Sequence, residues 1–209
     1  MQAHTVEWEI AATAARLVVE EGLDHGSAKR RAVQQLALPA RTPLPGNALI
    51  EDAVREHIAL FCGDTQPAEL LALRELAVVW MERLAEFHPH LTGAVWNGTA
   101  TRLTDVWLQL FCNDPKSAEM ALINQGQPYD VGSTRGFHGR EVDVLSLSVL
   151  CKGLGECIGV HLVLYDADDL RGALKPDANG RKLRGGLVQV QALMGEADGT
   201  PTHQMGWHS

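Results

Sequence analysis

The chain has 209 residues, of which 45% are hydrophobic and 21% charged, and its formal net charge is −8. This is an ordinary globular balance, sufficient for one large core or two small ones. The negative charge argues against a broad electropositive surface for duplex nucleic acid, whose affinity comes mostly from Lys and Arg. No stretch approaches the roughly 20 uninterrupted apolar residues that span a bilayer, and the N-terminus lacks a signal-peptide pattern. We therefore expect a cytoplasmic protein with no membrane contact.

Helical periodicity predicts three helices at the start of the chain. Apolar residues recur at helical spacing over 6–21, and Gly22 is a natural stop. A second helix is expected over about 24–38, and a third follows a segment with two prolines and a glycine and ends near Phe61. We therefore expect residues 1–66 to form a helical N-terminal region.

The following segment mixes helices and strands. A helix over 67–87 carries one apolar stripe suited to packing along a sheet. Two short β-rich runs at 91–96 and 104–112 come next, and we expect them to be neighbouring strands. Later elements are a helix from 115 to near 126, strands at 128–131, 140–151 and 157–166, a helical turn at 166–171 and a last helix from about 183. The fold class is therefore α+β, with a mixed β-sheet and flanking helices at 67–195 and a disordered tail at 196–209.

The segment NGTATRLTDVWLQLF, in the order helix, strand, turn, strand, resembles the nucleotidyltransferase superfamily of the DNA polymerase β type. In that family a Gly followed by Ser or Gly ends one strand, the next strand carries acidic residues two apart, and a later strand supplies a third acid. Residues two apart on a strand share a face, so their carboxylates can hold Mg²⁺ against a triphosphate. The chain also resembles uncharacterised proteobacterial proteins with a comparable GTA and LQLF pattern, which suggests a degenerate branch.

Carried onto this chain, over roughly residues 67–165, the resemblance implies particular site residues. Gly98 and Thr99 match the turn that cradles phosphate, and Asp105 matches the first acid. The second acidic position is occupied by Trp107, and the spacing from turn to acid is shorter than the family usually shows. Asp143, between two valines on a later strand, has the local pattern of the third acid. The implied Mg²⁺ ligands are therefore Asp105 and Asp143.

Each candidate residue also has a plainer interpretation. Arg102 could contact phosphate or simply be exposed, and Trp107 could stack on a base or ribose or serve in packing. Asp105 could cap a turn. Glu141 and Asp143 share a strand face, so they could be a carboxylate pair or the wet face of an edge strand.

Two functions follow from the resemblance, with an NTP and Mg²⁺ as the implied ligands. One is nucleotidyl transfer to a hydroxyl acceptor with an incomplete acidic triad. The other is a non-catalytic descendant that uses the same cleft to bind a nucleotide or a protein partner. Trp107 favours the second, because an indole in place of a carboxylate removes a metal ligand and adds bulk. A purely structural interaction module is a third possibility. Neither GxSxG nor GxGxxG is present, so a serine hydrolase or a Rossmann domain is not expected.

Overall fold

The computed structural model describes residues 2–177 and 180–197. Three helices come first: α1 (Gln2–Glu21), α2 (His25–Gln35) and α3 (Asn47–Phe61). Gly22, at φ +68°, ends α1. The side chain of Asp24 caps α2 by accepting a 3.0 Å hydrogen bond from the backbone N–H of Ser27. The predicted helical N-terminal region is thereby confirmed.

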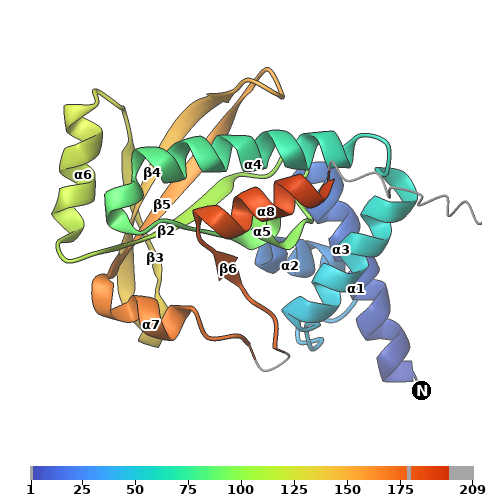
Figure 1. The fold of residues 1–209 in the computed structure, drawn as a ribbon. Helices are drawn as coiled ribbons and strands as arrows, with labels where there is room; N and C mark the ends of the chain where they lie inside the picture. Colours follow the sequence, from blue (N-terminus) through green and yellow to red (C-terminus); the bar gives the residue numbers. More distant parts are fainter. Residues whose placement is uncertain (1, 178–179, 198–209) are drawn as a thin grey trace, which may run out of the picture.

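These three helices bury a hydrophobic core of their own. Its most buried members include Ile10, Ala14, Leu17, Ala32, Ile50 and Val54. The apolar residues of α1 recur at helical spacing, so they fall on the face that contacts α2 and α3. Figure 1 shows this group, coloured blue to cyan, beside the rest of the molecule.

The rest of the described chain alternates helices and strands. In order these are α4 (Gln66–Arg83), β1 (His90–Thr92), α5 (Gly93–Asn97), β2 (Val106–Cys112), α6 (Pro115–Asn124), β3 (Asp130–Arg135), β4 (Glu141–Cys151), β5 (Glu156–Asp166), α7 (Leu170–Ala173), β6 (Arg184–Gly185) and α8 (Leu187–Ala197). Short 3-10 turns lie at Ala85–Phe87, Phe137–Gly139 and Ala167–Asp169.

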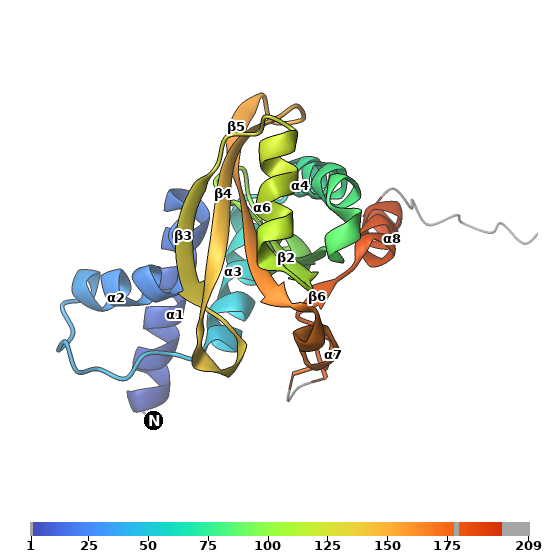
Figure 2. The same ribbon diagram turned by 90° about the vertical axis from the view of Figure 1, so that its left-hand side faces the viewer.

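The six strands form one mixed sheet in the order β3-β4-β5-β2-β1-β6. β2 and β5 are parallel, and the other neighbouring strands are antiparallel. Figure 2 shows α4, α6 and α8 on one side of the sheet and α1 and α2 on the other. Buried side chains of α4, α6 and α8 join those of β2, β4 and β5 in the larger hydrophobic core. The α+β class with a mixed sheet and flanking helices is therefore confirmed.

Several boundaries differ from the sequence prediction. The expected strand over 91–96 is wrong beyond Thr92, because residues 93–97 form α5. The helix predicted over 67–87 ends at Arg83 and continues as a separate 3-10 turn. The short strand β6 was not predicted. Of the tail predicted to be disordered, the first two residues belong to α8, and residues 198–209 lie outside the described residues.

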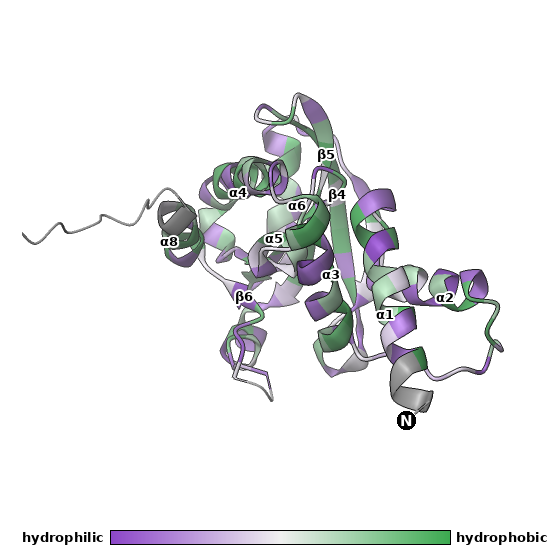
Figure 3. Ribbon diagram, turned by 90° about the vertical axis from the view of Figure 1, so that its right-hand side faces the viewer, coloured by the Kyte–Doolittle hydropathy of each residue, from purple (hydrophilic) through white to green (hydrophobic). Residues whose placement is uncertain are grey.

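The strands inside the sheet are more hydrophobic than the N-terminal helices. Figure 3 shows β4 and β5 as largely hydrophobic ribbons, whereas α1–α3 alternate hydrophilic and hydrophobic stretches. Among the described residues, no helix combines the length and the apolar character that crossing a membrane requires.

Candidate functional site

The start of β2 presents side chains to the face of the sheet that α4 does not cover. Val106 and Leu108 are fully buried in the core on the α4 side. Asp105 and Trp107 alternate with them and therefore point to the opposite face. The side chain of Asp105 is 49% exposed, and Trp107 is 37% exposed. Two of the predicted site residues thus lie together on an accessible surface.

His161 on β5 lies directly beside Trp107. The two residues are Cα partners in the parallel pairing of β2 with β5. Their rings stack with centroids 4.3 Å apart and planes inclined by 29°. The aromatic side chain that replaces the expected second acid is therefore supported by an imidazole on the neighbouring strand.

Asp105 is held in place from β5 by two hydrogen bonds. Its Oδ2 lies 3.1 Å from Nε2 of His161, and its Oδ1 accepts a 3.0 Å bond from the backbone N–H of Gly159. The hydrogen bond to His161 lowers the pKa of Asp105; partial burial opposes this, and the charge of His161 and the Gly159 bond lower it further. A Cβ at position 159 would lie 2.6 Å from Oδ1, so only glycine allows this approach. The carboxylate is consequently ionised and fixed in orientation.

Ser146 on β4 completes the group, which we call the Asp105 cluster: Asp105, Trp107, Ser146 and His161. Ser146 Oγ lies 2.9 Å from Nδ1 of His161, its Cα partner in the β4–β5 pairing. Sequence reasoning missed both His161 and Ser146, because only the register of three strands brings them to Asp105. The spacing of residues within a short sequence motif does not reveal the register between strands.

Asp143 does not share this site. On β4 it is three residues from Ser146, and side chains alternate along a strand, so it points to the opposite face of the sheet. It lines a separate cavity of about 240 Å³ with other polar residues, including Arg140, Glu141, Asp166 and Asp169. The structure therefore does not bring Asp105 and Asp143 together as ligands of one ion.

The predicted phosphate turn is engaged in structural contacts. Gly98 ends α5 at φ +81°, and the backbone N–H of Thr99 donates a 2.9 Å hydrogen bond to the carbonyl of Ala94. Thr99 is only 5% exposed, and Gln66 donates to the carbonyls of Gly98 and Ala100. The N–H of Thr99 is thus already used within the chain.

A different pair of small residues ends β1. Gly93 and Ala94 follow Thr92 directly, and Gly93 adopts φ +71° with nothing within 4 Å of the position of a Cβ. A strand that ends in Gly is part of the pattern that the resemblance assigns to Gly98 and Thr99, although Ala94 stands where that pattern has Ser or Gly. The spacing from Gly93 to Asp105 is longer than the spacing from Gly98 to Asp105, and this difference in the sequence favours Gly93 as the turn.

Arg102 contacts two neighbouring glutamates. Its guanidinium contacts Glu156 at the start of β5, and its backbone N–H donates a 3.0 Å hydrogen bond to Glu69 of α4. Its side chain is half exposed. This pairing orients the loop that leads into Asp105.

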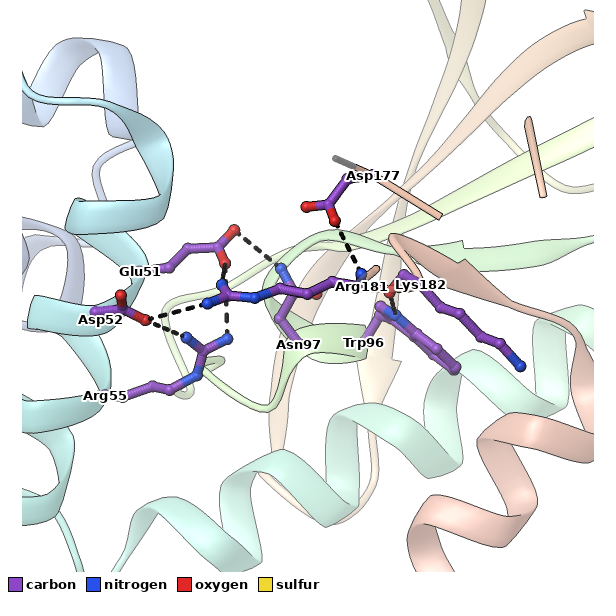
Figure 4. Close-up of polar contacts among 8 residues, drawn as sticks. All are labelled: Glu51, Asp52, Arg55, Trp96, Asn97, Asp177, Arg181 and Lys182. Carbon is purple, nitrogen blue, oxygen red and sulfur yellow. Dashed lines mark hydrogen bonds and ion pairs between the residues drawn. The ribbon is translucent and has the colours of Figure 1, made fainter. Parts of the chain in front are cut away.

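Polar contacts connect the helical region to the segment around α5 (Figure 4). Glu51 on α3 accepts a 3.1 Å hydrogen bond from Nδ2 of Asn97, and Arg181 lies 4.0 Å from carboxylate oxygens of Glu51 and Asp52. Trp96 donates a 2.7 Å bond to the carbonyl of Lys182. Exposed ion pairs such as those of Arg181 each contribute about 0–1 kcal/mol, so they orient the two parts more than they stabilise them.

The Asp105 cluster does not fit a Mg²⁺ ion. This cation prefers several oxygen ligands in octahedral geometry. Asp105 is the single carboxylate of the cluster; one of its oxygens contacts the imidazole of His161, whose other neighbour is the indole of Trp107. Within the part of the chain that the structure describes, no three His, Cys, Asp or Glu side chains are grouped to hold a metal.

Comparisons with known proteins return similarity to solved structures alone. No family model matches the chain, and no curated protein matches it significantly. A structure of a cytoplasmic RNA terminal U-transferase is similar with a TM-score of 0.36 and 13% identity, over 57% of this chain and 39% of that chain. Cid1 with the UTP analog UMPNPP gives a TM-score of 0.34 and 12% identity, over 53% and 36%. The Cid1 poly(U) polymerase with MgGTP gives 0.35 and 12%, over 53% and 38%.

The chain thus spans less than two fifths of the length of the protein chain in each of these three structures. TM-scores of this size do not establish a common fold. The site is therefore assigned from the contacts within this chain.

Proposed function

We propose that this protein is a nucleotidyltransferase-like nucleotide-binding module that no longer transfers nucleotidyl groups. The ligand is a nucleoside triphosphate, and its base or ribose stacks on Trp107. The proposal rests on the sequence resemblance together with the geometry of the Asp105 cluster.

The observation that supports it most is the pairing of Trp107 with His161. The two rings stack at 4.3 Å on a face of the sheet where Trp107 remains 37% exposed. Stacking against a neighbouring ring and attachment to a strand restrict the indole, so little conformational entropy is lost when a base packs on it. Every nucleobase has a flat π-face, and stacking on an aromatic side chain contributes about 1–3 kcal/mol per base.

The same geometry argues against transfer by metal ions. Two-metal catalysis requires carboxylates that converge on ions bridging the nucleophile and the leaving group. In the cluster Asp105 has no second carboxylate beside it, and both its oxygens accept hydrogen bonds from β5. Nucleotide affinity should be about the same with Mg²⁺ and with EDTA.

Thermal shift and transfer assays test this proposal. Each of the four NTPs at millimolar concentration is added to the wild-type protein, and at least one should raise the melting temperature, because a ligand that binds the native state stabilises it. Transfer from radiolabelled NTP should stay at the level of a no-protein control. No shift with any NTP would contradict nucleotide binding.

The transfer assay also distinguishes an active nucleotidyltransferase from the non-catalytic module that we propose. If transfer survives, Asp105→Asn should abolish it without unfolding the protein, and Trp107→Asp should raise activity or metal affinity. Turnover that depends on Mg²⁺ and on Asp105 would therefore overturn the non-catalytic proposal.

A further inference from the structure

The Asp105 cluster contains a hydrogen-bonded chain that nucleotide binding does not use. It runs from the carboxylate of Asp105 to the imidazole of His161 and on to the hydroxyl of Ser146, with lengths of 3.1 Å and 2.9 Å. Asp105 directly precedes β2, His161 lies on β5 and Ser146 lies on β4, and these three strands are neighbours in the sheet.

The direction of each hydrogen bond follows from the chemistry of the groups. An ionised carboxylate can only accept, so Nε2 of His161 carries a proton and donates to Asp105. In the neutral imidazole Nδ1 is then an acceptor, and the hydroxyl of Ser146 donates to it. In this neutral form of His161 the serine proton points at a base, and that base is oriented by a fixed carboxylate.

We propose that Ser146 is an activated nucleophile that reacts with carboxylic esters and related acylating or phosphonylating compounds. Serine is a weak nucleophile on its own and becomes effective when a neighbouring base takes its proton. Here His161 is the base and Asp105 is a positioning residue that holds the tautomer and stabilises the imidazolium as it forms.

The step balances without a metal or a cofactor. Ser146 Oγ forms a bond to the acyl carbon while its proton passes to Nδ1 of His161. The bond between the acyl carbon and the ester oxygen then breaks, and the departing alcohol takes that proton. Water then attacks the acyl carbon while His161 takes one of its protons; the bond from the acyl carbon to Ser146 Oγ breaks, His161 returns the proton to Oγ, and the carboxylic acid leaves.

Accessibility and rigidity support this role. Ser146 is partly buried, and the side chains of His161 and Asp105 are 19% and 49% exposed, so the chain lies at the protein surface. Gly159 fixes the carboxylate from β5, and Trp107 stacks on the imidazole, which limits rotation of both. A sequence search for GxSxG cannot find this arrangement, because here the serine lies within a strand.

Labelling with a fluorophosphonate tests the proposal on the full chain. The reagent forms a P–O bond to the reactive serine and loses fluoride. Intact mass and peptide mapping should show one adduct, on Ser146. The matched control is Ser148→Ala, since Ser148 lies on the same strand and face but pairs with Gly159. We expect S148A to label like the wild type and S146A not to label.

Two further variants test the activation itself. His161→Gln and Asp105→Asn should each slow labelling of Ser146 by at least about 100-fold. Asp105→Asn should also move the midpoint of the pH–rate profile to lower pH, a readout that a purely structural role would leave in place. Circular dichroism confirms that each variant is folded.

An absence of wild-type labelling above S146A would overturn the proposal, and so would equal labelling rates in H161Q and the wild type. These readouts need no nucleotide, so their failure is distinct from a failure of NTP binding.

Discussion

Replacing Gln66 with leucine should destabilise the protein by removing a clamp on the loop before β2. Gln66 is 6% exposed, and its Nε2 donates to the carbonyl oxygens of Gly98 at 3.1 Å and Ala100 at 2.8 Å. Leucine fills a similar volume but leaves both carbonyls without this donor. An unsatisfied buried polar group costs about 1–3 kcal/mol, and the carbonyl of Ala100 is buried whereas that of Gly98 is partly buried, so we predict a loss of about 2 kcal/mol in the free energy of unfolding.

Differential scanning calorimetry measures this effect directly. For a chain of this size, about 2 kcal/mol corresponds to a fall of about 4–8 °C in the melting temperature. The control is Gln34→Leu, because Gln34 is an exposed residue of α2 and should change stability by less than about 0.5 kcal/mol. A Q66L variant as stable as Q34L would refute the view that residues 98–100 are held mainly by structural contacts.

Two other predictions follow from the contacts around the site. Gly185→Ala should destabilise the protein by about 1–3 kcal/mol in urea unfolding, because a Cβ there would lie 2.2 Å from the ring of Trp96; an unchanged midpoint would be inconsistent with the packing of β6 on α5. Asp105→Asn should lower stability at neutral pH, and the difference from the wild type should shrink as the pH falls. The pKa of Asp105 is lowered by folding, so its contribution is present above its ordinary value of 3.8 and is lost below it. A difference that stays constant from pH 7 to pH 2 would contradict this assignment.

The sequence predicts most of the fold because the longer elements are strongly patterned. The helices α1, α3 and α4 have apolar residues at helical spacing, and β4 and β5 are segments of strand length rich in valine and leucine, with polar residues between them. The prediction of a strand over 93–97 is wrong, because the valine and tryptophan of this segment favour a strand by propensity alone. Tertiary contacts decide otherwise: the buried guanidinium of Arg74 donates to the carbonyl of Val95, and Gly93 and Gly98 adopt left-handed φ angles at the two ends.

The sequence predicts only those residues of the site that lie close together along the chain. Asp105 and Trp107 are two residues apart, so a strand places them on one face whatever the rest of the fold does. His161 and Ser146 reach them through the pairing of β2 with β5 and of β5 with β4, and a shift of one residue in either register would turn them away. The local pattern of Asp143 predicts the third acid, but the register of β4 places its side chain on the other face of the sheet.

Isothermal titration calorimetry with Trp107→Ala tests the proposed function most directly. The NTP that gives the largest thermal shift is titrated into the wild type, W107A and Trp8→Ala, each with Mg²⁺ and with EDTA. Trp8 is 52% exposed on α1 and is not part of the Asp105 cluster, so W8A is the matched control. We predict that W107A weakens binding by about 1–3 kcal/mol, or about 5- to 150-fold in Kd, that W8A binds like the wild type, and that EDTA has little effect. Equal affinities for W107A and the wild type, or binding that is lost in EDTA, would contradict a stacking site without metal.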